Sequence, residues 1–532
     1  MINYRHIFYN KVSKERRVCA TMITIAAILI ASTLLLTLDS FSLQLSKNDG
    51  NAFAQSELIG STSGSNAPNT NIFNLPAGYT IKPVVWNLTA PDSVTFDDKG
   101  NMYVGEAGYP FTNLPHVPRI LKIDPSGNVS VFVDTKLNSP IVDITFHNGL
   151  LYVSHMNKIS TVDITNGTVK DIIVGLPENG GDHFNNMIAF SPDEKRLFFG
   201  TGTRTNSGVV GMDNYGWLAN TPSVADIPGK NITLTGQNFI TKNPLTAEPN
   251  DNATTGAFVP FNSTAKEGQV IKGQVKCNGC ILSANLDGTD LRLMGWGIRN
   301  PTGLAFNEEG RLFAASHGAD ERGSRPIVND WDKFYEVKLN GTSLFYGWPD
   351  FFGNAQPVTD PNFQWQVGTI CIDPNPCLDK PLEFLMQNHP PVEKPLALFE
   401  PPHTAVQQMA FANKSFGFGG EAFVAQVGAH GVRGVGQSVV HINIENETTT
   451  ISDFLTLKNP TEANSTTFRP IGVEFSQNGT ALYIVDWGNL LEPPAGGPTI
   501  PNTGVVWEIM PVAGNQTSVA TTTSAAKGAT AQ

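Results

Sequence analysis

Apolar and polar positions repeat along this chain of 532 residues in a way that predicts paired strands. In six stretches an apolar segment ends in phenylalanine, a short polar turn follows, and a second apolar segment carries an aromatic residue. Short apolar segments on both sides of a polar turn are typical of two antiparallel strands joined by a hairpin. The anchoring residues are Phe96, Phe146, Phe190, Phe306, Phe411 and Phe475.

The spacing of these anchors predicts a β-propeller. Successive anchors lie 50, 44, 116, 105 and 64 residues apart, and a four-stranded propeller blade occupies roughly 40–50 residues. We therefore expect an all-β fold, a six-bladed β-propeller over residues 75–512. The two long spacings should hold insertions, at 203–276 and 320–402, and long ordered loops on a rigid scaffold commonly shape a binding site.

A propeller brings the starts of its innermost strands together around one axial opening, so one repeat position in several blades should form the site. The position seven residues before the anchor holds His183 in the third repeat and Arg299 in the fourth, and Asn300 and Arg469 stand one residue later in their repeats. Any one of these residues alone would suit an exposed hairpin. Their shared register instead favours a central pocket.

Composition and charge limit the partners. Hydrophobic residues make up 40% of the chain and charged residues 15%, which suits a large core, and the net charge of −12 argues against a nucleic-acid partner. Residues 1–38 contain a basic segment followed by twenty uncharged residues, 19–38, which predict a transmembrane anchor or, alternatively, a long signal peptide. Either one places the globular part outside the cytoplasm. Residues 39–74 should form a flexible linker and 513–532 a disordered tail.

The sequons and cysteines agree with export. Twelve Asn-x-Ser/Thr sequons suit a glycoprotein. Beyond Cys19, four cysteines remain: Cys277, Cys280, Cys371 and Cys377. In an oxidising compartment the simplest interpretation is two local disulfides, and a four-cysteine zinc site is the alternative.

One segment carries a family resemblance. Residues 297–306 (GIRNPTGLAF) resemble the RNPxGLAF signature of the soluble glucose/sorbosone dehydrogenases, six-bladed quinoproteins that bind pyrroloquinoline quinone (PQQ) and calcium. The similarity continues through residues 316–320 (SHGAD) and 346–349 (YGWP), and residues 183–202 resemble the strand with the family's catalytic histidine. It covers about residues 75–510 and is strongest over 277–353.

The resemblance implies the oxidation of a sugar, an aldose or a related alcohol by hydride transfer to PQQ. His183 would be the general base, Arg299 would stabilise negative charge on the quinone oxygens, and Asn300 would hydrogen-bond the cofactor. Electrons would pass to an external acceptor, such as a membrane quinone or a small redox protein.

The resemblance also implies a calcium site and cations for the three PQQ carboxylates. The backbone carbonyls of Gly318 and Ala319 would hold the calcium ion. Arg469 and Arg433 are the candidate carboxylate ligands. Asp320, Glu321 and Asp330 stand near this loop: one of them could be an outer calcium ligand, but we expect them to be solvated loop carboxylates. We expect His317 to be a structural neighbour rather than a catalyst.

This chain departs from the family at two points. Residues 203–207 (TRTNS) stand where the family often has a cofactor-binding glutamine, and Ala319 replaces a proline. Two other functions therefore remain open: a metal-dependent propeller hydrolase, such as a lactonase, and a non-catalytic surface-binding propeller. The repeat position holds no carboxylate in any of the six repeats, which counts against the hydrolase.

Overall fold

The computed structural model describes residues 60–61, 67–108, 117–177, 180–181, 183–246, 248, 251–365, 378, 380–428, 434–445, 448–460, 468–490 and 499–512. The predicted membrane segment 19–38, the tail 513–532, Arg433, Cys371 and Cys377 lie outside these residues. Within them, no helix is both long and apolar enough to cross a membrane.

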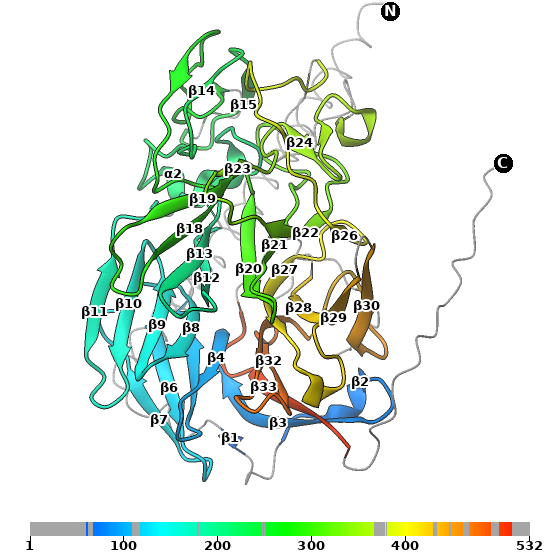
Figure 1. Ribbon diagram of the computed structural model, residues 1–532. Coiled ribbons are helices and arrows are strands. Elements are labelled where there is room, and N and C mark those ends of the chain that lie inside the picture. The colour runs from blue at the N-terminus through cyan, green and yellow to red at the C-terminus, as the bar shows by residue number, and fades with distance from the viewer. Residues whose placement is uncertain are drawn as a thin grey trace, which may run out of the picture. The chain divides into compact units, whose positions relative to one another are not determined.

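Six antiparallel sheets, the blades, form the fold (Figure 1). Blade 1 consists of β4 (Pro91–Phe96), β5 (Met102–Glu106), β6 (Arg119–Ile123) and β7 (Val129–Val133). Blade 2 consists of β8 (Ile141–His147), β9 (Leu150–His155), β10 (Lys158–Asp163) and β11 (Val169–Ile173). Blade 3 consists of β12 (Asn185–Phe190), β13 (Arg196–Thr201), β18 (Cys280–Asn285), β19 (Arg292–Trp296) and β23 (Leu344–Phe345), the last parallel to β19.

The remaining blades complete the ring. Blade 4 consists of β20 (Asn300–Phe306), β21 (Leu312–His317), β22 (Asp332–Val337) and β26 (Ala397–Phe399). Blade 5 consists of β27 (Val406–Phe411), β28 (Ala422–Gln426), β29 (Ser438–Glu445), β30 (Thr448–Leu457) and β2 (Phe73–Asn74). Blade 6 consists of β31 (Pro470–Phe475), β32 (Leu482–Asp486), β33 (Gly504–Pro511), β3 (Tyr79–Leu88) and β1 (Gly60–Ser61).

The innermost strands close into a ring, because β4, β8, β12, β20, β27 and β31 each contact the next and β31 contacts β4. The predicted six-bladed propeller is therefore confirmed. Blade 6 pairs β3, from the start of the described chain, with β33, from its end. Two short strands from the expected linker 39–74 join sheet edges, β1 beside β3 and β2 beside β30.

The phenylalanine anchors are contacts between blades. Each ends its innermost strand or stands one residue before that end. Five pack against the aromatic residue on the second strand of the preceding blade: Phe96 on Tyr483, Phe190 on Tyr152, Phe306 on Phe198, Phe411 on Phe313, and Phe475 on Phe423, with ring centroids 4.6–5.6 Å apart. Such a pair contributes about 0.5–1.5 kcal/mol beyond its buried area. The repeated sequence pattern thus reflects a packing interface that recurs between neighbouring blades.

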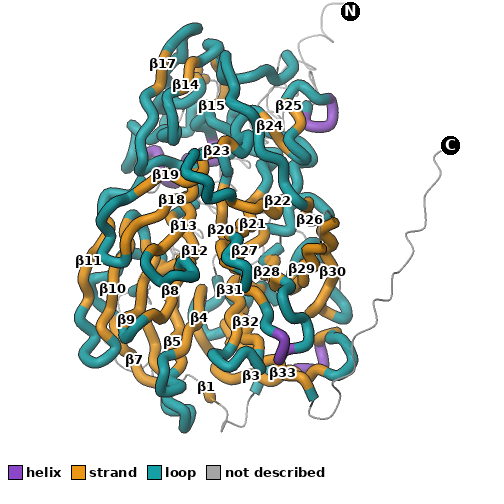
Figure 2. Tube along the Cα trace, in the orientation of Figure 1, coloured by secondary structure: helices purple, strands orange, loops and turns teal. Residues whose placement is uncertain are grey.

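The two long insertions consist mainly of loops (Figure 2). The first contains two hairpins, β14 (Ile232–Thr233) with β17 (Val270–Ile271) and β15 (Asn238–Lys242) with β16 (Asn252–Gly256), and the short helices η3 (Met212–Asn214) and α2 (Tyr215–Leu218). The second contains β24 (Phe351–Phe352) with β25 (Gln356–Pro357) and η4 (Pro361–Phe363). Two further 3-10 turns are η2 (Thr70–Ile72) and η5 (Lys414–Phe416).

Three carboxyl groups lie on the inner strands of neighbouring blades: Asp92 on β4, Asp143 on β8 and Glu474 on β31. Burial raises the pKa of Asp143 to about 6. Burial, and then the charge of Asp143, raises the pKa of Asp92 well above its usual range and that of Glu474 to about 8. The proton on Glu474 is therefore bound more tightly in the folded than in the unfolded chain.

Glu474→Gln should change how stability depends on pH. The stabilisation from the Glu474 proton is complete below the ordinary pKa of 4.5 and is lost as the pH rises through about 8. Because glutamine does not ionise, the melting temperature of the variant should exceed that of the wild type at pH 8–9, and the gap should close toward pH 4.5. Glu309→Gln, at an exposed site, is the control. If the melting temperatures of Glu474→Gln and wild type differ by the same amount at every pH in this range, the raised pKa of Glu474 is wrong.

Candidate functional site

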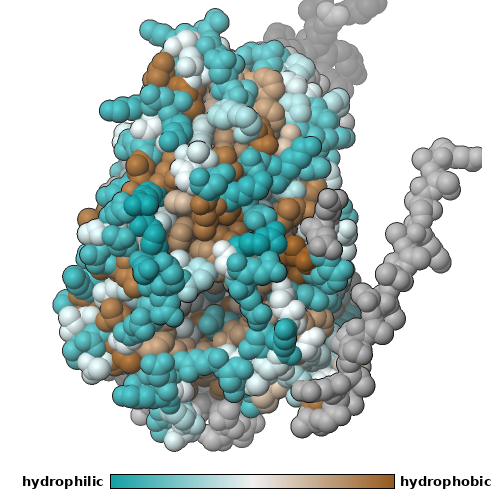
Figure 3. All heavy atoms as spheres, in the orientation of Figure 1, coloured by the Kyte–Doolittle hydropathy of each residue, from teal (hydrophilic) through white to brown (hydrophobic). Residues whose placement is uncertain are grey.

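The repeat position chosen from the sequence lies at one end of the ring, which we call the axial mouth. Five of its six residues stand two positions before an innermost strand, and Arg299 stands one position before β20. Strand register therefore brings His183 and Arg299 to the same end of adjacent blades, 3 and 4. Hydrophobic residues gather near the middle of the view in Figure 3, where Figure 1 places β20.

His183 is almost fully buried, and its ring is fixed by the backbone. Its Nδ1 lies 3.0 Å from the carbonyl oxygen of Thr203. Because a carbonyl only accepts hydrogen bonds, Nδ1 carries the proton, and Nε2 is the basic nitrogen of the neutral ring. This is the tautomer that a general base requires. The ring stands edge-on to His317, with centroids 5.8 Å apart.

Gly202 allows His183 and Asn300 to approach each other. A Cβ atom at residue 202 would lie 2.4 Å from both the Cβ of His183 and the Oδ1 of Asn300. Such an atom would force the two side chains apart.

Gly202→Ala should therefore lower catalytic turnover. A displacement of about 1 Å in a positioned group can cost on the order of 100-fold in rate. We expect a loss of that order in kcat/KM, with a small fall in melting temperature, both measured on the purified variant. Gly216→Ala, where a Cβ meets no atom within 4 Å, is the control. Wild-type kinetics for Gly202→Ala would show that the close approach has no role.

Arg299 is buried, and its guanidinium group contacts three groups at the mouth. It donates from Nε to the carbonyl of Asn206, from Nη1 to the carbonyl of Gly318 and from Nη2 to Asp320 at 2.7 Å. Although burial alone would raise it, the guanidinium groups of Arg299 and Arg322 hold the pKa of Asp320 well below its usual range. Asp320 is therefore an ion-pair partner, which corrects its expected role as a solvated loop carboxylate.

The loop at residues 318–319 is held by two buried carboxylates. Gly318 donates its N–H to Asp332 at 2.7 Å, and Ala319 donates to Asp330 at 2.6 Å. Asp330 is only 1% exposed, so its prediction as a solvated carboxylate is wrong. The N–H and C=O of a trans peptide point in opposite directions, so the bond from Ala319 to Asp330 directs the Gly318 carbonyl toward Arg299.

The carbonyl oxygens of Gly318 and Ala319 are the kind of ligand that a calcium ion binds. Calcium takes backbone carbonyl oxygens readily. Asp330 fixes the orientation of the Gly318 carbonyl through the Ala319 N–H. The side-chain oxygen of Asn206 fixes that of the Ala319 carbonyl through the Asp320 N–H. The carbonyl of Gly318 accepts from Arg299 in this structure, so an ion bound there would share or replace that contact. Among the described residues, no group of three or more His, Cys, Asp or Glu side chains is arranged to hold a metal. A carbonyl site is thus the arrangement that these residues support.

Asn300 is held by two side chains from different blades. Its Oδ1 accepts from Asn186 at 2.9 Å, and its Nδ2 donates to Nδ1 of His317 at 3.2 Å. The Nε2 of His317 donates to the carbonyl of Val406 at 2.7 Å, and burial lowers the pKa of this histidine. His317 is therefore a neutral residue that positions Asn300.

Arg469 is also buried at the axial mouth, and its Nη1 donates to the carbonyl of Val427 at 3.0 Å. Arg433, its companion in the prediction, lies outside the described residues. Sequence reasoning missed His403, which stands beside Asp320 with Nδ1 3.4 Å from Oδ1. Hydrogen bonding to Asp320 and Glu321 raises the pKa of His403 to about 10. No repeat signal points to this residue, because Thr404 occupies the repeat position.

The second insertion closes over the segment 203–207. Trp348, from the YGWP motif, donates its indole N–H to the carbonyl of Asn206 at 3.0 Å. The fully buried Arg325 donates to the carbonyls of Ser207 and Pro349 and pairs with Asp350. Residues 203–207, where the chain departs from the family pattern, are thereby fixed by side chains that donate to their backbone carbonyls.

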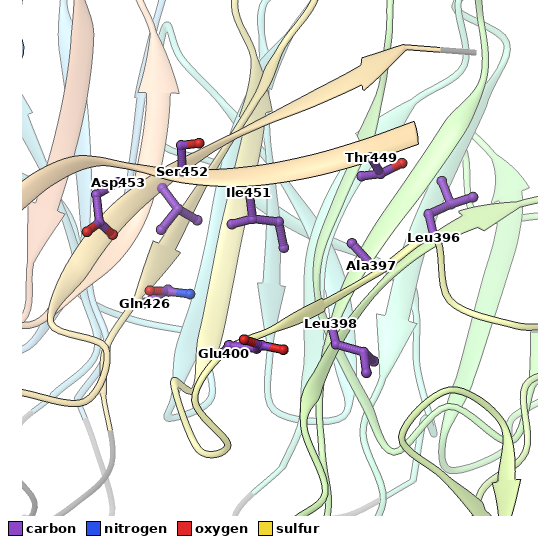
Figure 4. A pocket seen from close by; sticks show the side chains of 10 residues that line it. Leu396, Ala397, Leu398, Glu400, Gln426, Thr449, Ile451, Ser452 and Asp453 are labelled. Carbon is purple, nitrogen blue, oxygen red and sulfur yellow. The ribbon is translucent and has the colours of Figure 1, made fainter. Parts of the chain in front are cut away.

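A separate groove of about 550 Å³ lies between the outer strands β26 and β30 (Figure 4). Glu400 and Asp453 supply its charge, and none of the residues that line it is basic. This composition does not suit a ligand with several carboxylates. The axial mouth, with its buried arginines, does.

Comparisons with known proteins agree with this geometry. Residues 283–486 match the family model described as TrAA12-like, which confirms the recognition made from the sequence. The fold is similar to the holo form of the pyranose dehydrogenase PQQ domain from Coprinopsis cinerea, at 18% identity and a TM-score of 0.52, covering 84% of this chain and 99% of that one. No curated protein matches this chain in sequence.

A calcium structure of a carbohydrate-active enzyme of family AA12 from Trichoderma reesei is similar at 16% identity and a TM-score of 0.52, covering 84% of this chain and 99% of that one. An iodide structure from the same organism and family has 15% identity, a TM-score of 0.52, and covers 84% and 100%. At these identities the likeness supports the propeller fold.

Proposed function

We propose that this chain catalyses the PQQ- and calcium-dependent oxidation of a sugar, an aldose or a related alcohol. Its residues 283–486 match the TrAA12-like family model. The observation that carries this proposal is the bond from Nδ1 of His183 to Thr203, which leaves Nε2 as the base at a mouth that also contains Arg299 and the 318–319 carbonyls. The similarity to a PQQ domain of a pyranose dehydrogenase supports it.

Each residue at the axial mouth has a separate role in the proposed reaction. His183 Nε2 accepts the hydroxyl proton of the substrate as its C–H bond breaks. Arg299, a buried side chain, places positive charge where the oxygen becomes negative. Asn300 orients the cofactor, and the carbonyls of Gly318 and Ala319 would hold the calcium. When bound, PQQ supplies the hydride acceptor and calcium supplies the Lewis acid that polarises it.

Arginines account for the binding of an anionic cofactor. Arg469 is our candidate ligand for a PQQ carboxylate, because it is a buried cation at the same mouth and a guanidinium group matches a carboxylate in geometry. Arg433, which lies outside the described residues, is a second candidate from the sequence.

We further propose that the enzyme works on the outer face of a membrane, anchored by residues 19–38 or released if that segment is cleaved. Electrons would leave to a quinone or a small redox protein. The Cys277–Cys280 disulfide supports export, and it removes these two cysteines from a zinc site. Within the part of the chain that the structure describes, seven sequon asparagines are exposed and available for glycosylation: Asn128, Asn166, Asn231, Asn252, Asn262, Asn340 and Asn478.

The test is a titration of the purified chain with PQQ, with calcium or with a chelator present, followed by absorbance and thermal shift. We expect saturable, calcium-dependent binding and a rise in melting temperature, because a ligand at 100 times its Kd stabilises by about 2.7 kcal/mol. The Arg469→Gln variant should bind PQQ more weakly than the wild type. If the wild type binds PQQ, its oxidation of a panel of sugars is then measured with a dye as the electron acceptor. Absence of binding at micromolar PQQ would overturn the proposal and favour a hydrolase or a non-catalytic binding propeller.

A further inference from the structure

We infer that the Cys277–Cys280 disulfide is a positioning element of the active site, which sets the places of both His183 and Arg299. The inference rests on the proposed function and assigns a role to a motif that the mechanism above does not use. Three features of the disulfide turn support it: its place in blade 3, its hydrogen bonds toward His183 and its hydrogen bond toward Arg299.

The disulfide turn, residues 277–280, lies at the mouth end of blade 3. Cys280 is the first residue of β18, and it pairs with Thr201 at the end of β13 and with Trp296 at the end of β19. Just past Thr201 the chain reaches Gly202 and Thr203, and just past Trp296 it reaches Arg299. The turn therefore stands between the two segments that determine the site. Both cysteines are fully buried.

Two hydrogen bonds connect the turn to the support of His183. Thr201 donates its hydroxyl to the carbonyl of Cys277 at 2.8 Å, and Asn278 donates its side-chain amide to the carbonyl of Gly202 at 3.1 Å. Gly202 in turn donates its N–H to the carbonyl of Phe184, the neighbour of His183. The next carbonyl, that of Thr203, holds Nδ1 of His183. The turn thus fixes the Gly202–Thr203 peptide, which directly precedes the carbonyl that selects the tautomer of the base.

A third bond connects the same turn to Arg299. Ile298 donates its N–H to the carbonyl of Gly279 at 3.0 Å, and Thr203 donates to the carbonyl of Arg299 at 2.8 Å. Gly279 has φ +65°, and a Cβ there would lie 2.7 Å from the carbonyl oxygen of Ile298. The turn therefore packs directly on the segment that leads into Arg299. One cross-linked turn of four residues supports both functional side chains.

The short span of the disulfide makes its effect local. The entropic stabilisation by a disulfide grows with the length of the loop that it closes, so a loop this short adds less to global stability than a long one. What the disulfide limits is the range of shapes of the turn itself. Its removal should therefore affect the alignment of His183 and Arg299 more than the folding of the propeller.

The experiment compares wild type with C277A/C280A and with Ile442→Val, a core variant in blade 5 that serves as a stability control. The measurements are kcat, KM, melting temperature and amide hydrogen exchange. For C277A/C280A we expect kcat to fall about 10- to 100-fold, KM to change less, and the amides of Thr203 and Ile298 to exchange faster. Exchange at Val104 in blade 1 should not change. Ile442→Val should lower the melting temperature without lowering kcat.

Two results would overturn the inference: wild-type kcat in C277A/C280A, or unchanged exchange at Thr203 and Ile298. If C277A/C280A does not fold, Asn278→Ala tests the same path, because it keeps the disulfide and removes the bond to Gly202. It should lower kcat with the disulfide intact. If the wild type neither binds PQQ nor oxidises any substrate, the proposed function fails, and the exchange comparison still decides whether the disulfide positions these residues.

Discussion

His183→Ala should lower kcat by about 100- to 10,000-fold, the usual contribution of a positioned general base, and should leave PQQ binding nearly unchanged. The reason lies in the geometry: the Thr203 carbonyl holds the proton of His183 on Nδ1, so the nitrogen that can accept a substrate proton is Nε2. Alanine removes this acceptor without altering the arginines that would bind an anionic cofactor. Steady-state kinetics with a dye acceptor and a PQQ titration by absorbance measure the two quantities separately.

The matched control is His441→Ala, a histidine paired with Glu421 on blade 5, which should retain wild-type turnover. Added imidazole should restore part of the activity of His183→Ala, because it can replace the lost proton acceptor in the vacated space. Normal substrate oxidation by His183→Ala would refute the proposed mechanism. A loss of PQQ affinity as large as the loss of turnover would instead assign His183 to cofactor binding.

Arg299→Ala should weaken both PQQ binding and catalysis, with kcat lower by about 100- to 1,000-fold, as for the loss of one preorganised donor to a developing negative charge. This residue differs from His183 because its guanidinium joins the Gly318 carbonyl, the Asn206 carbonyl and Asp320. Its removal takes a cation from the mouth and also removes the donor that contacts the Gly318 carbonyl. The measurements are the PQQ dissociation constant with saturating calcium, and kcat at saturating PQQ.

Arg322→Ala is the comparison for Arg299→Ala. Arg322 also pairs with Asp320, at 2.8 Å, and its side chain is more exposed than that of Arg299. If charge near Asp320 were all that mattered, the two variants would behave alike. We expect Arg322→Ala to have the smaller effect, so equal losses would argue against a specific role for Arg299.

The fold could be predicted from the sequence because its main interface repeats. Five of the six anchors pack on an aromatic residue of the preceding blade, as Phe306 does on Phe198, so the same two positions are large and apolar from repeat to repeat. The register of the innermost strands follows from this contact. It also brings the polar residues seven positions earlier to one mouth, which is why His183 and Arg299 could be selected together.

The supports of the site could not be predicted in this way. Thr203 acts through its backbone carbonyl, which leaves no mark on residue identity. Asn186 acts across to the next blade, and Asp330 reaches Ala319 from within an insertion, where no repeat constrains the chain. Asp330 was expected to be solvated because acidic loop residues usually are, yet two N–H groups and Lys333 bind it in the interior. Such contacts depend on the path of the insertions through space.

The pairing of β3 with β33 has a consequence for biogenesis. Tyr79 meets Pro511 and Leu88 meets Gly504 across the last sheet, so one strand of this blade is made more than 400 residues before its partner. During synthesis β3 must wait without that partner until residues 504–511 have been made. Blades 1 and 2 are each formed from consecutive strands and can assemble as they emerge, but the ring cannot close before β33 arrives. Ring closure therefore depends on the synthesis of β33.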